Sequence, residues 1–206
     1  MRYLVVLSIL SSLGCGQISR SPPPPLSFAS VDIQNAGDPP IVPPSSASVV
    51  IVGDSIIAQW PGLPAYIVNA GVGGQTTAQI LARFDADVVA RHPATVVIEG
   101  GVNDVAITGS VDSSNVIAMI GKAQAAGIRV VLLEVLWPNN ETDVSPTAVL
   151  EYNAQLLVIA RAYGVEIIDT YGPFVGRPEL FRPNNNVHPI AAGYDLLWAL
   201  LSPVIP

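Results

Sequence analysis

Cysteine, lysine and histidine are scarce in this sequence. Among its 206 residues there are one cysteine, Cys15, one lysine, Lys122, and two histidines, His92 and His188. A single cysteine cannot form an internal disulfide, so the fold must depend on its apolar core. One cysteine and two histidines do not supply the ligands or the spacing of a common zinc site, and we therefore expect no metal.

Positive charge is scarce as well. Nine lysine and arginine residues stand against 16 aspartate and glutamate residues, which gives a formal net charge of −7. Nucleic-acid binding and attachment to an anionic membrane surface both need clustered cations. The composition argues against both kinds of partner. Hydrophobic residues make up 50% of the chain, which is sufficient for one domain with a sizeable core.

The N-terminus has the pattern of an export signal. Arg2 supplies a positive start, and the apolar run that follows is too short to span a bilayer. The run ends at Cys15, a placement that resembles a bacterial lipoprotein signal, although Ser12 departs from the usual leucine. We expect residues 1–15 to be a signal peptide with a lipidated cysteine, and the protein to be periplasmic or at the cell surface. A plain secretory signal is the alternative.

The segment after the signal is a proline-rich linker. Proline is too dense in residues 16–47 for a helix or a central strand, and the chain is expected to be extended where prolines cluster. We assign residues 48–206 to one globular domain.

Within that domain, short apolar runs alternate with helical patterns. The runs predict strands at residues 48–52, 65–70, 94–99, 128–135 and 165–169, and the patterns predict helices at 76–92, 113–127, 146–164 and 189–201. Near-continuous apolar strands indicate a parallel sheet that is covered on both faces. We predict an α/β fold with three layers, a doubly wound five-stranded parallel sheet in the flavodoxin-like order 2-1-3-4-5. Ligands then bind beyond the C-terminal ends of the strands.

Residues that suit acyl transfer stand at these strand ends. Ser55 lies in "GDS", Gly74 in "NAGVGGQT", Asn103 in "GGVND" and His188 in "VHP". Acyl transfer needs a serine at a tight turn, hydrogen-bond donors for an oxyanion and a histidine that moves the serine proton. The order and spacing of the four blocks resemble the SGNH (GDSL-type) hydrolase family over about residues 48–203, and most of all its small single-domain esterases.

The resemblance implies a role for each matched residue. Ser55 would be the nucleophile and His188 the base. The Ser55 N–H, the Gly74 N–H and the Asn103 side chain would form the oxyanion hole, and the family uses no metal or organic cofactor. Asp54 is expected to fix the turn through hydrogen bonds. Ordinary structural interpretations exist beside these: a helix cap for Ser55, a turn for Gly74 or Asn103, and a surface position for His188.

One position departs from the family pattern. The aspartate expected three residues before the histidine is Asn185 here, and an amide lacks the charge that stabilises an imidazolium. Either Asn185 or a backbone carbonyl would orient His188. The first hypothesis is an active serine esterase for short-chain esters, including acetyl groups on a glycan or lipid, with a lysophospholipase or thioesterase as the variant. The second is a catalytically impaired glycan-binding protein on the same scaffold.

Five further side chains near this edge have no role that the sequence assigns. Glu99 and Glu134 end the third and fourth predicted strands, where each could line a pocket or pair with an arginine. Trp60, Trp137 and Pro138 lie on predicted loops, where they could form an apolar pocket or cover the core.

Overall fold

The computed structural model describes residues 49–139, 144–183 and 187–206. Its strands form one five-stranded sheet. All strand pairs are parallel and the order is β2-β1-β3-β4-β5, which confirms the predicted topology. The strands are β1 (Val49–Gly53), β2 (Ile67–Gly71), β3 (Thr95–Ile98), β4 (Arg129–Leu133) and β5 (Glu166–Ile168).

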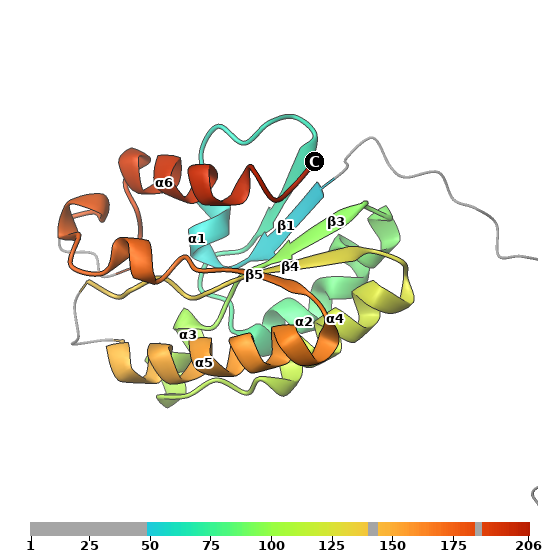
Figure 1. Ribbon diagram of the computed structural model, residues 1–206, viewed down its shortest axis with the longest axis horizontal. Helices are drawn as coiled ribbons and strands as arrows, with labels where there is room; N and C mark the ends of the chain where they lie inside the picture. The colour runs from blue at the N-terminus through green and yellow to red at the C-terminus, as the bar shows by residue number, and fades with distance from the viewer. Residues whose placement is uncertain (1–48, 140–143, 184–186) are drawn as a thin grey trace, which may run out of the picture. The chain divides into compact units, whose positions relative to one another are not determined.

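Helices cover both faces of the sheet, as Figure 1 shows. One face carries α2 (Thr77–Asp87), α3 (Val102–Thr108), α4 (Ser114–Ala125) and α5 (Pro146–Tyr163). The other face carries α1 (Ser55–Ala58) and α6 (Ala191–Leu201). Short 3-10 helices occur at Val89–Arg91, Gly172–Phe174 and Pro178–Leu180. Among the described residues, no helix has both the length and the apolarity to cross a membrane.

Strand β1 explains why the predicted strands are apolar without alternation. Val50 and Val52 pack toward α2, α4 and α5, whereas Val49 and Ile51 pack toward α1 and α6. All four side chains have no exposed surface. Because both faces of a central parallel strand are buried, every position favours an apolar residue.

The helix bounds differ from the prediction in two respects. The helix predicted at 76–92 ends at Asp87 and gives way to a 3-10 turn, after which His92 adopts a left-handed conformation with φ 47° before Pro93. Proline disfavours the α-helical conformation at the residue before it, so the helix could not have included His92. Helices α1 and α3 were not predicted, because elements of four and seven residues are too short to show a helical period.

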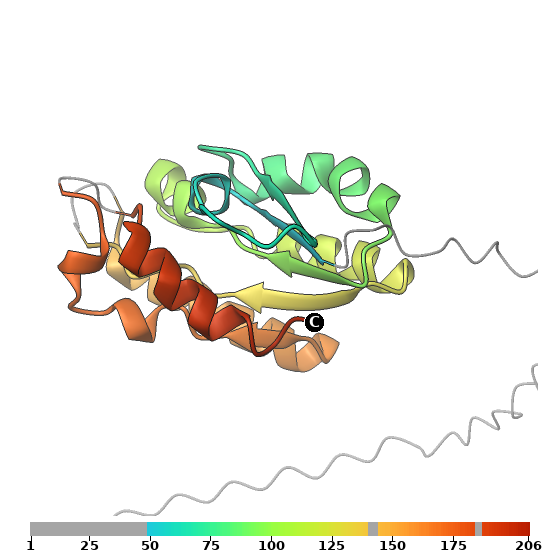
Figure 2. The same ribbon diagram turned by 90° about the horizontal axis from the view of Figure 1, so that it is seen from above.

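The residues that follow the parallel strands lie at one edge of the sheet. Figure 2 shows the first turn of α6 at the end of the sheet toward which the strand arrows point, with the C-terminus at the opposite end. Residues that follow β1, β2 and β3, and those that precede α6, therefore meet at the C-terminal edge of the sheet. This is the edge at which open α/β sheets bind ligands.

Candidate active site

Ser55 and His188 are in hydrogen-bond contact although 133 residues separate them in the chain. The distance between His188 Nε2 and Ser55 Oγ is 2.8 Å. Ser55 is the first residue of α1, immediately beyond β1, and His188 lies shortly before α6. This is the distance at which an imidazole can take a proton from a hydroxyl.

Asp54 holds the turn that presents Ser55. Its carboxylate is fully buried, and Oδ1 accepts a 2.9 Å hydrogen bond from the Ile56 N–H. Asp54 is thus the N-cap of α1, and the alternative of a capping role for Ser55 is wrong. Oδ2 accepts a 3.2 Å hydrogen bond from the amide of Asn103, which links the turn after β1 to the start of α3. The Ser55 hydroxyl is left for His188.

Asn103 has two acceptors within the protein. Its Nδ2 donates to Asp54 Oδ2 at 3.2 Å and to the Gln75 carbonyl at 3.0 Å. A primary amide carries two protons, so both are engaged. Any oxyanion that Asn103 binds must compete with these acceptors. Gln75 directly follows Gly74, so the same amide also fixes the loop after β2.

That loop lies against the nucleophile. A Cβ placed on Gly73 would lie 3.8 Å from Ser55 Cβ, which is ordinary van der Waals contact. Gly74 has φ +76°, a conformation that L side chains rarely adopt, and no atom lies within 4 Å of its Cβ position. Glycine is therefore favoured at position 74 by backbone conformation and not by lack of space.

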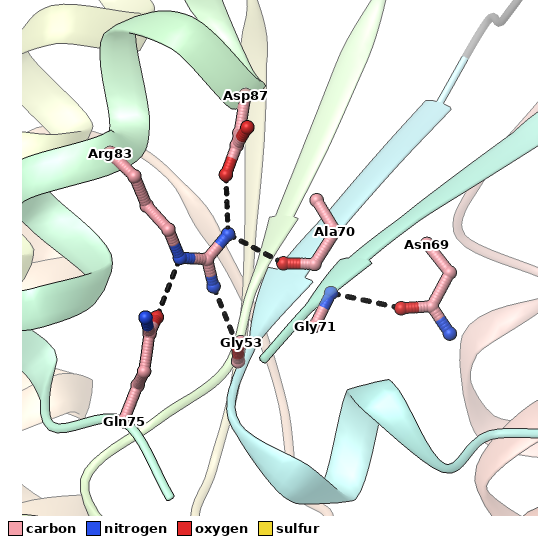
Figure 3. A network of polar contacts seen from close by, with 7 residues as sticks. All are labelled: Gly53, Asn69, Ala70, Gly71, Gln75, Arg83 and Asp87. Carbon is pink, nitrogen blue, oxygen red and sulfur yellow. Dashed lines mark hydrogen bonds and ion pairs between the residues drawn. The ribbon is translucent and has the colours of Figure 1, made fainter. Parts of the chain in front are cut away.

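Arg83 on α2 ties this loop to the sheet, as Figure 3 shows. Its Nε donates to Gln75 Oε1 at 2.6 Å, and its Nη2 donates to the Gly53 carbonyl at 2.9 Å. Nη1 donates to the Ala70 carbonyl and to Asp87 Oδ2, both at 2.7 Å. One guanidinium thus joins the ends of β1 and β2 to the loop after β2. No signal in the sequence singled out Arg83, because it is 30 positions from Gly53 and lies outside the four blocks.

The end of β2 also packs tightly on α1. Asn69 Nδ2 donates to the Ile57 carbonyl at 2.7 Å, and Asn69 Oδ1 accepts from the Gly71 N–H at 2.9 Å (Figure 3 shows the second contact). A Cβ on Gly71 would lie 2.2 Å from the Ala58 nitrogen. Position 71 therefore excludes any side chain while α1 keeps its place.

The surroundings of His188 favour its neutral form. Partial burial lowers the pKa of its imidazole, and the positive charge of Arg182 lowers it further. A neutral ring at pH 7 can accept the Ser55 proton. Asn185, the residue we expect to orient this ring, lies outside the described residues, and its role stays a prediction.

Arg182→Gln is expected to shift the acidic limb of the kcat/KM profile to higher pH. Removal of the cation raises the pKa of His188, so the base becomes protonated, and inactive, at a higher pH. The backbone bond from the Arg182 N–H to the His188 carbonyl, 3.0 Å long, should survive. Plateau kcat should change by less than about twofold. Because Arg182 is exposed, the pH shift should become smaller in high salt. If the acidic limb does not move at low salt, Arg182 does not affect the pKa of His188.

The two strand-end glutamates are buried and neither pairs with an arginine among the described ion pairs. Glu99 faces Asp54, whose N–H donates to Glu99 Oε2 at 3.4 Å. Burial raises the pKa of Glu134 to about 7, and the nearby Asp169 carboxyl adds to this effect. Across the described ranges, no three side chains of His, Cys, Asp or Glu cluster as metal ligands.

The two tryptophans on the predicted loops, Trp60 and Trp137, both pack against other aromatic rings. Trp60 is buried with its ring centroid 5.8 Å from that of Tyr194, and it lines a cleft of about 350 Å³ between the 60–64 loop and α6. Trp137 packs edge-on against Phe181 at 6.2 Å. The cleft is of the size that takes small organic ligands.

Comparisons with known proteins agree with this geometry. The sequence profile of the GDSL-like lipase/acylhydrolase family matches residues 51–196. Esterase TesA from Pseudomonas aeruginosa is 27% identical over 186 residues, which cover 78% of this chain and 90% of TesA. A GDSL-like lipase structure from Bacteroides thetaiotaomicron superposes with a TM-score of 0.69 at 30% identity, over 77% of this chain and 87% of that one. The acetylxylan esterase Axe2 from Geobacillus stearothermophilus shares the fold, with a TM-score of 0.64 and 21% identity over 76% of this chain and 93% of that one.

The doubly wound parallel sheet with a hydroxyl and an imidazole at its C-terminal edge is the framework of an ester-hydrolysing α/β enzyme. The chain belongs to the GDSL-like lipase/acylhydrolase family, which confirms the resemblance seen in its sequence, and it is a carboxylic ester hydrolase of this type.

Proposed function

We propose that the protein hydrolyses short-chain carboxylic esters, acetyl esters included, through an acyl-enzyme on Ser55. The observation that carries the proposal is the 2.8 Å contact between Ser55 Oγ and His188 Nε2. The esterase TesA supports the ester class, and the acetylxylan esterase Axe2, which is similar by fold alone, motivates the acetyl substrate. The natural substrate would be a small ester or an acylated glycan or lipid.

In this mechanism Ser55 Oγ attacks the ester carbonyl carbon while His188 Nε2 takes the hydroxyl proton. The carbonyl oxygen becomes an oxyanion that accepts from the Ser55 N–H, the Gly74 N–H and Asn103 Nδ2. The C–O bond to the alcohol then breaks, and His188 returns its proton to the departing alkoxide. Water attacks the acyl-enzyme by the same steps in reverse, with His188 as base.

A lysophospholipase or thioesterase is a second candidate within the same chemistry, and it would need an apolar surface such as the cleft beside Trp60, whose lining includes neither Ser55 nor His188. Its walls include Leu63, Tyr194 and Trp198, which suit an apolar chain. A lysophospholipid or an acyl thioester would use such a surface.

A chain-length series of p-nitrophenyl esters tests both candidates. We expect kcat/KM to be highest for acetate and butyrate, and a maximum at octanoate or beyond would favour the second candidate. A serine-directed phosphonate should label the protein and stop hydrolysis. If no ester or thioester is cleaved and no label is incorporated, while an acetylated glycan still binds, then the impaired binding protein is the correct hypothesis.

We also propose that the protein is exported and anchored by lipid on Cys15, which lies outside the described residues. The support is the position of the single cysteine after a short apolar run. Mass spectrometry of membrane-extracted protein should find residues 1–14 removed and Cys15 acylated. A mature soluble form that begins after Cys15 would contradict the anchor.

A further inference from the structure

A buried carboxyl lies beneath the catalytic turn and takes no part in the mechanism above. Glu99, at the end of β3, is 3% exposed. Its Oε2 lies 3.4 Å from the Asp54 nitrogen, and its carboxyl group acts electrostatically on that of Asp54. A Cβ on Gly53 would lie 2.7 Å from Glu99 Oε2, so the glutamate is closely packed against β1.

Two adjacent buried carboxyls cannot both ionise at low cost. Burial raises the pKa of Glu99 well above its usual range, and the neighbouring Asp54 raises it further. Burial also raises the pKa of Asp54, to about 6, although the Ile56 N–H and Glu99 oppose this. The Asp54 carboxylate accepts hydrogen bonds from the Ile56 N–H and from Asn103 Nδ2, which favours its charged form, so a proton held by the pair belongs on Glu99.

The far side of Glu99 faces a small cavity. Among the described residues, Glu99 Oε1 and Tyr152 Oη are buried side-chain atoms without a hydrogen-bond partner. Both residues line a cavity of about 10 Å³ together with Thr77 and Gly100. This volume holds about one water molecule, and a water there would satisfy both atoms.

Tyr152 also supports the turn that carries Asn103. A Cβ on Gly101, which has φ +130°, would lie 2.6 Å from Tyr152 Cε1. The ring thus packs directly under the residue that precedes α3. Burial raises the pKa of Tyr152, and the charge of Asp104 raises it further, so this hydroxyl stays neutral and can donate.

We propose that Glu99 is a positioning residue for the oxyanion hole: as a neutral acid it donates a hydrogen bond to the Asp54 carboxylate, and one buried water joins its Oε1 to Tyr152 Oη. The arrangement keeps Asp54 charged and fixed. Asp54 in turn holds the Ile56 N–H, which sets α1 and Ser55, and the amide of Asn103. This inference rests on the proposed function for its kinetic consequences only.

Loss of the Glu99 proton at alkaline pH would place two repelling carboxylates, Glu99 and Asp54, side by side. The titratable groups that act on the pair are Asp54 itself, Asp104 on α3, Tyr152 on α5 and Tyr194 on α6. None of these is a cation that could offset a second negative charge, and the Arg83 guanidinium, which donates to the Gly53 carbonyl, is already paired with Asp87. We therefore expect kcat of the wild-type enzyme to fall on an alkaline limb that reports Glu99.

Glu99→Gln and Glu99→Ala separate this role from a simple packing role. Glutamine is a neutral donor of similar shape, so kcat should stay within about threefold of wild type and the alkaline limb should disappear. Alanine removes the donor, so kcat should fall by about tenfold or more with little change in KM. Glu134→Gln is the matched control, a buried strand-end glutamate outside the site, and should keep both kcat and the limb.

Thermal unfolding provides a readout that needs no activity. The folded protein holds the Glu99 proton at a pH where the unfolded chain has released it, so wild-type stability falls as pH rises above the usual glutamate pKa. Glu99→Gln should lose the part of this decline that Glu99 causes, while Asp54 and Glu134, whose pKa values are also raised, keep theirs. Its Tm advantage over wild type should therefore grow with pH. An alkaline limb retained in Glu99→Gln, or equal pH dependence of Tm in the two proteins, would overturn the proposal. Absence of all esterase activity in a wild-type protein that shows the expected Tm behaviour would instead overturn the proposed function.

Discussion

Replacement of Ser55 by alanine is expected to abolish ester hydrolysis, with a loss in kcat of about 10⁴-fold or more, while the domain remains folded. The Ser55 hydroxyl lies 2.8 Å from His188 Nε2, just beyond the end of β1. Its removal deletes the atom that forms the acyl-enzyme. The turn itself should persist, because the N-cap of α1 is the Asp54 carboxylate and not the Ser55 hydroxyl.

The measurement is kcat on p-nitrophenyl acetate, with circular dichroism and thermal unfolding to verify the fold. Phosphonate labelling followed by mass spectrometry should place the adduct on Ser55 and find none in the variant. Ser110→Ala, at an exposed serine after α3, is a matched control that should keep full activity and labelling. A folded Ser55→Ala protein with wild-type activity would exclude this nucleophile.

Asn103→Ala is expected to lower kcat by about 10²–10³-fold, with a smaller effect on KM. The amide donates to charge that develops in the transition state. The variant also removes the links from Nδ2 to Asp54 and to the Gln75 carbonyl, so part of the loss comes from a looser loop after β2. Both contributions act on the oxyanion hole and therefore on kcat.

Steady-state kinetics of Asn103→Ala and Asn115→Ala should separate the oxyanion role from general support. Asn115 on α4 also donates from Nδ2, to Thr77 Oγ1 at 3.0 Å, but it belongs to no part of the proposed hole. We expect Asn115→Ala to lower Tm while kcat stays within about threefold of wild type. If Asn103→Ala changes KM alone, Asn103 binds substrate and does not stabilise the oxyanion.

The sheet order and the meeting of Ser55 with His188 could be predicted because their signals are local. Each strand is a short apolar run, and each block stands beside a strand or a helix, so the topology alone brings the blocks to one edge. The contacts of Arg83 with the ends of β1 and β2 could not be predicted. They depend on how far the Arg83 side chain extends from α2 toward the sheet, and no local pattern in the sequence gives that. The pairing of Glu99 with Asp54 joins residues 45 positions apart and likewise has no local pattern.

The two hydrogen bonds of the Asn103 amide affect how strongly the site binds the transition state relative to the bound ester. The Asp54 carboxylate and the Gln75 carbonyl already occupy its protons, so a neutral ester oxygen gains little by displacing either one. A full negative charge on that oxygen competes far better for the same protons. We therefore expect the resting site to have low affinity for the intact ester and to respond to the charge that develops on the carbonyl oxygen during the reaction. Boronates and phosphonates, which place an anionic oxygen at this point, should bind much more tightly than substrate analogues of the same size.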